Sequence, residues 1–320
     1  MRIVALVPGG IGDQILFFPT LDDLKRNYPD AEIDVVTEPR SLGAYRICKS
    51  VSNVLKFDFK DRNSLTEWVD LIGNIRDREY DIAICAGKRP FVGMALWLSG
   101  VAVRVSYQGG GNLFLTNSVP LKTEQYVAAM YHDLLKGLGI STPCPDLTIN
   151  VPKSDLEWAD KEQQRLGIKD SGYILIHGGS SQLAAAKTSI QTYPVQSWRQ
   201  VIQNLQQRQP DLPIAILVQT AEDEQLVRSL QEAFPDLKVT NPPDIGKTAA
   251  TIAAANLLLC TDSAPMHLAV AVQTYTIALF GATDPKKLIP PSDRCIAIKS
   301  PTGKLSDIAP QTVLERVWGG

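Results

Sequence analysis

A glycine-rich turn followed by a carboxylate is the first feature of the sequence that could do chemistry. The segment VPGGIGD, residues 7–13, follows an apolar run and leads into an expected helix, so Asp13 lies near a helix N-terminus. Glycines such as Gly12 let the backbone turn tightly and let a ligand approach closely. Asp13 could take the proton from an attacking hydroxyl, which typically contributes ~10²–10⁴-fold in rate. It could instead only cap the helix, a role worth ~1 kcal/mol, and both interpretations stay open.

A second candidate site is the segment TDSAPMHLA, residues 261–269, where a strand ends and a helix is expected to start. Free N–H groups and a partial positive charge at such a helix end suit a phosphate. Asp262, Ser263 and Ala264 lie at this boundary, and Ser263 adds a hydroxyl donor. His267 follows one turn later, either as a packed core histidine or as a residue facing the ligand.

The segment IHGGSSQLAAAK, residues 176–187, is a plausible loop over a diphosphate. Ser180 and Ser181 would contact the phosphates. Lys187 would neutralise charge on the leaving group, the electrostatic help that often dominates catalysis, unless it is a solvated loop lysine. Glu222 follows the apolar run 213–218, where it would meet a nucleotide ribose or cap a helix.

Metal and nicotinamide chemistry lack their usual sequence signals. The three histidines are far apart in the sequence and form no H-x-x-x-H pair, and no D-x-D pair ends a strand. A dinucleotide fingerprint would need glycine in place of Ile15. We therefore expect a metal-independent site in which a helix N-terminus, hydroxyls and a lysine meet the charge of a leaving diphosphate.

The bulk composition is that of an ordinary globular protein without a nucleic-acid partner. The chain has 320 residues, 44% of them hydrophobic, and a formal net charge of −2, whereas nucleic-acid binding usually needs a strongly basic face. Its five cysteines are scattered and show no C-x-x-C spacing, which favours a reducing compartment. No apolar run reaches the ~18 residues of a membrane span, and the first ten residues are too short for a signal peptide. We expect a cytoplasmic protein.

Strands and helices are expected to alternate in two halves of the chain. The runs at 2–7, 80–86 and 173–177 are typical of buried parallel strands, and a proline-rich join lies at 140–155. This pattern predicts an α/β protein with two doubly wound, Rossmann-like domains, 1–150 and 151–320, with a last helix that packs back on the first domain. Ligands of such sheets bind beyond the carboxyl ends of the strands, so we expect the site in a cleft that the two domains face.

These segments together resemble glycosyltransferase family 9, the bacterial heptosyltransferases of lipopolysaccharide synthesis. The resemblance spans roughly residues 1–300 and is strongest in GGIGDQILFFPTLDDLKRNYPDAEIDVV and in TDSAPMHLAVAVQTYTIALFGATDP. Two positions depart from the family, which usually has glycine where this chain has Ala264 and Gln273. The family's lysine also stands closer to an aromatic–proline pair than Lys187 stands to Tyr193-Pro194.

The resemblance implies the two-lobed GT-B fold, an inverting mechanism and a nucleotide-diphosphate sugar donor, with heptose as the default sugar and no cofactor. Asp13 matches the family's proposed base, and Asp262, Ser263 and His267 match its donor-binding block. The expected partners are the nucleotide sugar and a glycan or glycolipid acceptor, with peripheral contact at the cytoplasmic face of the inner membrane.

Two other functions stay open. A sugar-nucleotide epimerase of the same architecture would convert the donor without any acceptor. A non-catalytic nucleotide-sugar-binding protein or scaffold is compatible with the departures at Ala264 and in the lysine loop.

Overall fold

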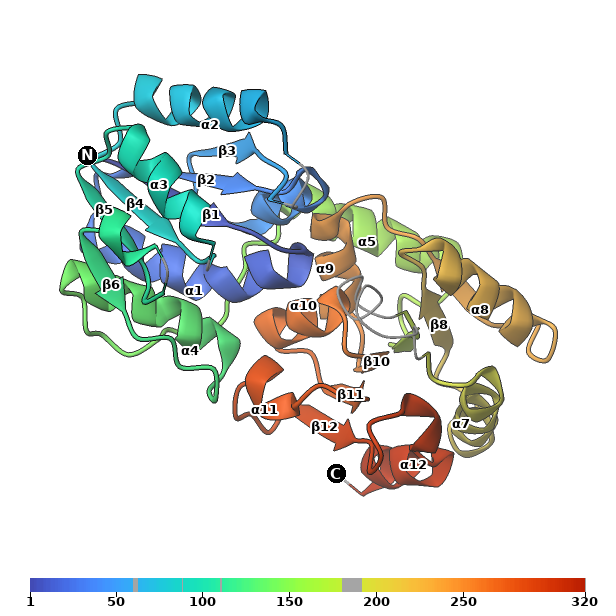
Figure 1. Cartoon of the computed structure of the whole chain (residues 1–320). Coiled ribbons are helices and arrows are strands. Elements are labelled where there is room, and N and C mark those ends of the chain that lie inside the picture. Colours follow the sequence, from blue (N-terminus) through green and yellow to red (C-terminus); the bar gives the residue numbers. More distant parts are fainter. Residues whose placement is uncertain (60–62, 88, 110, 180–191, 320) are drawn as a thin grey trace. The chain divides into compact units, whose positions relative to one another are not determined.

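The computed structural model describes residues 1–59, 63–87, 89–109, 111–179 and 192–319. The chain forms two compact units, Met1–Asn150 (unit 1) and Val151–Gly320 (unit 2), and each contains a hydrophobic core cluster. Each unit holds one six-stranded sheet whose paired strands run parallel (Figure 1). Both units are therefore α/β layers built in the same way.

The sheet of unit 1 has the strand order β3-β2-β1-β4-β5-β6. Its strands are β1 (Arg2–Val7), β2 (Glu32–Thr37), β3 (Asn53–Lys56), β4 (Ile82–Cys85), β5 (Val103–Tyr107) and β6 (Asn117–Val119). The central strands β1 and β4 are apolar and almost wholly buried, as expected when helices cover both faces of a parallel sheet.

The helices of unit 1 form two layers. α1 (Ile11–Asn27) and α4 (Val127–His132) pack together on one face, and α2 (Leu65–Asp77) and α3 (Pro90–Leu98) pack together on the other (Figure 1). The described part of unit 1 also contains the 3-10 helices η1 (Pro39–Ile47), η2 (Asn112–Phe114) and η3 (Asp133–Leu138). The α4–η3 segment ends at Gly139, whose φ of +79° lies in the left-handed region that favours glycine.

The sheet of unit 2 has the strand order β12-β11-β10-β7-β8-β9. Its strands are β7 (Ile174–His177), β8 (Ile214–Leu217), β9 (Lys238–Thr240), β10 (Leu257–Thr261), β11 (Thr276–Phe280) and β12 (Cys295–Lys299). The helices in the described part of unit 2 are α5 (Lys153–Leu166), α7 (Val195–Arg208), α8 (Ala221–Gln231), α9 (Ile245–Ala253), α10 (Ala264–Val272), α11 (Pro285–Leu288), η4 (Leu305–Asp307) and α12 (Pro310–Trp318). α5, α9 and α10 pack in one layer, and α7, α8 and α12 pack in another.

The last helix belongs to unit 2 and packs on α7, which corrects the expectation that it returns to the first domain. Val313 and Leu314 are buried in the core of unit 2. The indole of Trp318 donates a hydrogen bond to Asn204 on α7 at 3.0 Å. The apolar face of α12 is therefore already covered by its own unit.

The strand order of both sheets reverses beside their first strand. In unit 1 the reversal lies between β1 and β4, and in unit 2 it lies between β7 and β10. Open α/β sheets bind ligands beyond the carboxyl ends of the strands at this point. The turn after β1, the glycine pair after β7 and the start of α10 after β10 therefore lie at the ligand-binding edges of their sheets.

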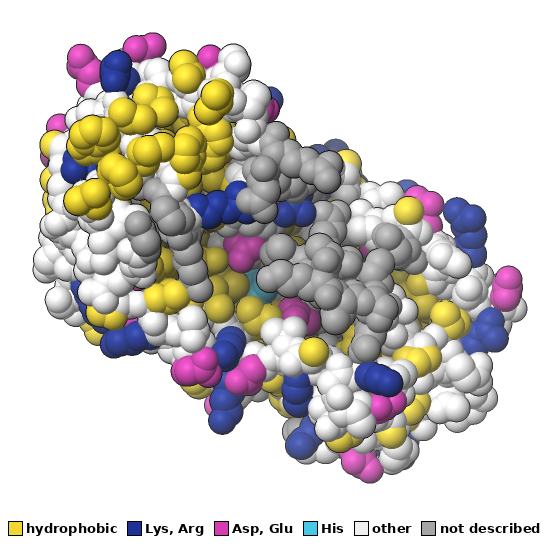
Figure 2. Space-filling view, viewed as in Figure 1, with side chains coloured by type: hydrophobic (Ala, Val, Ile, Leu, Met, Phe, Trp, Pro, Cys, Tyr) yellow, Lys and Arg dark blue, Asp and Glu magenta, His cyan; other side chains and the backbone are white. Residues whose placement is uncertain are grey.

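Exposed apolar side chains gather on one side of unit 1, which we call the α2–α3 apolar face (Figure 2). It consists of Leu65, Val69, Phe91, Trp97, Leu98 and Leu113, on α2, α3 and η2. Leu65 is 79% exposed and Leu113 is 89% exposed. In the described part of the chain, no helix is both long and apolar enough to cross a membrane.

Candidate active site

Asp13 lies in the first turn of α1, directly after the turn that ends β1. Its Oδ2 accepts a hydrogen bond from the backbone N–H of Gly10 at 2.8 Å, and its Oδ1 accepts one from the Tyr131 hydroxyl at 3.2 Å. The residue is partly exposed while Tyr131 is buried. Asp13 therefore does cap its helix, and the residue as a whole stays partly exposed.

The surroundings of Asp13 favour its protonated form more than water does. Burial raises the pKa of this carboxyl above its ordinary value, and the charge of Glu38 adds to the rise. The hydrogen bonds from Gly10 and Tyr131 and the charge of Arg40 lower the pKa, but they offset only part of the burial effect. A carboxylate with a raised pKa is a better proton acceptor, which is the property that a general base needs.

The glycine turn holds Asp13 closely. Gly9 has a φ of +120°, a conformation that other residues rarely adopt, and a Cβ placed there would lie 2.4 Å from Oδ2 of Asp13. The Ser41 hydroxyl donates to the Gly9 carbonyl at 2.8 Å. Gly12 lies in the same turn of α1 and is half-buried.

The segment after β10 forms the N-terminus of α10, as the sequence predicted. Ser263 occupies the N-cap position, yet its hydroxyl makes no capping hydrogen bond to the helix. It donates to the Thr261 carbonyl at 3.0 Å and contacts Nδ1 of His177 at 3.1 Å. Ala264 does not have a positive φ, so the alanine that replaces the family's glycine is not strained there.

Asp262 directly precedes the N-cap residue, and His267 is the fourth residue of α10. Burial raises the pKa of the Asp262 carboxyl, and a hydrogen bond from Thr283 partly offsets the rise. His267 is 5% exposed, and burial lowers the pKa of its imidazole to about 4. Its Nδ1 has no hydrogen-bond partner within the described ranges. His267 is therefore a neutral, buried ring at neutral pH.

Sequence reasoning missed His177, the last residue of β7. Its Nε2 lies 3.6 Å from Oδ2 of Asp223, while its Nδ1 contacts Ser263. All three residues are at most 3% exposed. The available signal was the position of His177 at a strand end before the glycine pair, but a strand-end histidine alone does not indicate its partners.

Several candidate residues cannot be placed in this site. Ser180, Ser181 and Lys187 lie outside the described residues. Glu222 lies in the first turn of α8, but its side chain is not described. Thr220 caps this helix instead, because its hydroxyl accepts the N–H of Asp223 at 3.3 Å.

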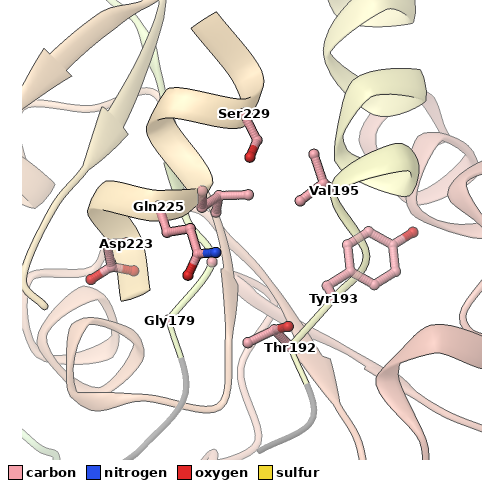
Figure 3. A pocket seen from close by; sticks show the side chains of 9 residues that line it. Gly179, Thr192, Tyr193, Val195, Asp223, Gln225 and Ser229 are labelled. Carbon is pink, nitrogen blue, oxygen red and sulfur yellow. The ribbon is translucent and has the colours of Figure 1, made fainter. Parts of the chain in front are cut away.

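A cavity of about 250 Å³ opens beside the glycine pair of β7. Figure 3 shows it between the start of α8, with Asp223, Gln225 and Ser229, and the segment that leads into α7, with Thr192, Tyr193 and Val195. Asp223 is 1% exposed, and its Oδ1 has no partner among the residues described. Across the same described ranges, no group of three or more ligating side chains could hold a metal ion.

Solved structures share this fold along nearly the whole chain. A family 9 glycosyltransferase from Veillonella parvula DSM 2008 superposes with a TM-score of 0.82 at 19% identity, covering 98% of this chain and 95% of that one. E. coli ADP-heptose LPS heptosyltransferase II superposes with a TM-score of 0.80 at 17% identity, covering 99% of this chain and 97% of that one. A UDP-GlcNAc 2-epimerase from Methanocaldococcus jannaschii superposes with a TM-score of 0.59 at 10% identity, covering 99% of this chain and 92% of that one. The chain therefore has the GT-B fold of these structures.

The sequence itself specifies the family. Residues 68–317 match the profile of glycosyltransferase family 9 (heptosyltransferase), which is more than half of the chain. This chain belongs to glycosyltransferase family 9, and the resemblance noted in the sequence is confirmed.

Two curated relatives extend the comparison. Lipopolysaccharide heptosyltransferase 3 of Escherichia coli K12 is 25% identical over 288 residues, 85% of this chain and 80% of that protein. The photosynthetic NDH subunit of subcomplex B 1 from Arabidopsis thaliana chloroplasts is 26% identical over 341 residues, 98% of this chain and 72% of that protein. Relatives with two different names thus align with most of the chain.

Proposed function

We propose that this chain transfers a sugar, heptose by the default of its family, from a nucleotide-diphosphate donor to a hydroxyl of a lipopolysaccharide-type envelope glycan. The transfer inverts the configuration and needs no metal ion. The observation that carries the proposal is Asp13: a partly exposed carboxylate, fixed by Gly10 and Tyr131 and with a raised pKa, at the ligand-binding edge of a family 9 fold.

In this proposal unit 2 binds the donor. Backbone N–H groups and the positive end of the dipole at the start of α10 receive the diphosphate, and Asp262, His267 and Lys187 complete the site. Ser180, Ser181 and Glu222 contact the phosphates and the ribose. Two solved E. coli heptosyltransferase WaaC structures, one with ADP and one with ADP-2-deoxy-2-fluoro heptose, share the fold with TM-scores of 0.78 and 0.74, which supports a nucleotide sugar as donor.

Unit 1 provides the base. Asp13 removes the proton from the acceptor hydroxyl as its oxygen attacks the anomeric carbon from the side opposite the leaving group. A new C–O bond forms, the bond from the anomeric carbon to the diphosphate breaks, and its electron pair leaves with the nucleoside diphosphate. The α10 N-terminus and Lys187 stabilise the charge that develops there, a contribution that is often the largest in such reactions.

The α2–α3 apolar face is proposed to contact the membrane that carries a glycolipid acceptor. Exposed Phe91, Trp97 and Leu113 suit the interface between lipid headgroups and acyl chains, where aromatic and aliphatic side chains lie. Flotation with vesicles tests this contact. The Trp97→Ser/Leu113→Ser double variant should bind vesicles less than the unchanged chain, and equal binding would contradict the proposal.

A donor screen by thermal shift tests the proposed function without knowledge of the acceptor. A nucleotide sugar at about a hundredfold its dissociation constant stabilises the folded chain by ~2.7 kcal/mol. ADP-sugars, UDP-sugars and GDP-sugars should be compared, and the absence of stabilisation by all of them would contradict the proposal. When the donor is incubated with the chain and no acceptor, its sugar should also keep its configuration. An isomerised donor would indicate that the chain is an epimerase.

The Arabidopsis relative favours a second candidate function, that of a subunit in a protein assembly. It aligns with 98% of this chain and is named as an NDH subunit. Affinity purification of this chain from its native cells would separate the two functions. Stoichiometric co-purification of a defined set of proteins would support the subunit role, whereas a monodisperse single chain that binds a nucleotide sugar would support transfer.

A further inference from the structure

We infer that His177 is a positioning residue that keeps the N-terminus of α10 open for the donor's diphosphate. The inference rests on the proposed function, because it concerns the same donor site. It is carried by the buried row Ser263–His177–Asp223, which links the start of α10 to the start of α8.

The hydroxyl of Ser263 is the first part of the argument. A serine at an N-cap position normally accepts a hydrogen bond from the N–H of the second or third helical residue. Here the second residue is Pro265, which has no N–H, so the N–H of Met266 is the donor that the Ser263 hydroxyl could accept from; it donates to the Ser263 carbonyl at 3.1 Å instead. The Ser263 side chain makes no capping bond and is turned toward Thr261 and His177 instead. The helix end is thus left without a side-chain cap that would compete with a phosphate.

The position of the imidazole is the second part. Asp223 is itself fixed, because its Oδ2 accepts from the N–H groups of Gln219 at 3.0 Å and Thr220 at 2.9 Å. The Asp223 carboxylate, 1% exposed, lies 3.6 Å from Nε2 on one side of the ring, while Nδ1 contacts the Ser263 hydroxyl at 3.1 Å on the other. Space around the ring is also restricted, since a Cβ on Gly179 would lie 3.0 Å from Cε1 of His177.

The row has the residue types of a nucleophile, a base and a carboxylate, but its burial excludes hydrolysis at Ser263. The serine is 3% exposed, and its hydroxyl is engaged on both sides. A group that no substrate reaches cannot attack one. The chemistry left for the row is orientation of the helix end.

Substitutions at His177 separate its two contacts. The amide of asparagine occupies the place of Nδ1 and keeps the contact with Ser263, whereas the amide of glutamine occupies the place of Nε2 and keeps only the contact with Asp223. ADP affinity, measured by calorimetry, should fall about tenfold in His177→Gln, equivalent to ~1.4 kcal/mol. The conservative His177→Asn should stay within about twofold of the unchanged chain, well inside the effect expected for a lost contact. His177→Leu lacks both contacts and should behave as His177→Gln does.

His132 provides a matched control in unit 1. It is 4% exposed, and its Nε2 lies 2.9 Å from Oδ2 of the buried Asp23. His132→Asn, whose amide does not reach the place of Nε2, should lower the melting temperature without changing ADP affinity. A loss of ADP affinity shared by His177→Gln and His132→Asn would mean a general loss of structure and would overturn the inference.

A second substitution gives a readout that a purely structural role would not move. If Ser263 caps the helix once His177 no longer holds it, then Ser263→Ala in the His177→Gln chain should recover most of the lost ADP affinity. No recovery, or an ADP affinity of His177→Gln equal to that of the unchanged chain, overturns the inference alone. Failure of the unchanged chain to bind any nucleoside diphosphate overturns the proposed function as well, so the two failures are distinguishable.

Discussion

Replacing Asp13 with asparagine separates its two possible roles, the general base and the helix cap. Asparagine keeps an oxygen for the N–H of Gly10, which donates to Asp13 at 2.8 Å, so the cap survives and only proton transfer is lost. Turnover should fall ~10²–10⁴-fold, which corresponds to ~3–5 kcal/mol in the activation barrier. Asp13→Ala removes the cap too and should also cost ~1 kcal/mol of folding stability.

Stability against pH gives an independent check on the same variant. Burial raises the pKa of Asp13 in the folded chain, so the folded state binds this proton more tightly than the unfolded state does. The ionised carboxylate therefore destabilises the fold above its folded pKa, and this penalty disappears as the pH falls through that value. Asp13→Asn should be the more stable chain at pH 8, with the difference shrinking toward pH 4.

The assay is release of nucleoside diphosphate from the donor in the presence of acceptor, with thermal unfolding of the same samples followed over the pH series. Donor affinity should be unchanged in Asp13→Asn, because the proposed donor groups lie in unit 2. Turnover equal to that of the unchanged chain would refute the role as base. A loss of stability in Asp13→Asn that is the same at pH 4 and pH 8 would refute the reasoning from burial.

Three further results are expected. Tyr131→Phe removes a hydrogen bond that lowers the pKa of Asp13, so the acid limb of the kcat/KM profile should move to higher pH, and an unmoved limb would show that the hydroxyl does not act on the carboxylate. Gly9→Ala forces a strained φ and an overlap with Asp13, which should cost ~1–3 kcal/mol in denaturant unfolding and reduce turnover; a fully active, equally stable variant would contradict the close approach. Burial lowers the pKa of His267 from 6.5 to about 4 on folding, so the free energy of unfolding should fall by ~3 kcal/mol as the pH drops across that range. His267→Leu should remove this pH dependence. Unfolding measurements in which the variant loses as much stability over the same pH range would refute a neutral His267.

The main strands and the helix ends were predictable because their signals are local. β1, β4, β7 and β10 are continuous apolar runs, and such runs indicate strands buried on both faces. The strands β3 and β6 were not predicted. Both are short edge strands whose residues are partly exposed, so they lack the apolar pattern that marks a central strand.

The site was predictable in position but less so in the use of its side chains. The glycine turn and the start of α10 fixed where Asp13 and Ser263 would lie. The direction of the Ser263 hydroxyl was not predictable, because it depends on His177, which is 86 residues away in the sequence. The link from His177 to Asp223 likewise depends on the pairing of β7 with β8 and β10, which no local pattern encodes.

The division of the chain at a single point, between Asn150 and Val151, has an evolutionary consequence. Each half is one uninterrupted stretch of sequence with its own sheet and core, so recombination at this junction would leave both folds intact. If unit 1 binds the acceptor and unit 2 the donor, as proposed, joining halves from different ancestors would create new pairings of donor and acceptor specificity. Chimaeras made at this junction would be the natural way to ask which half determines each specificity.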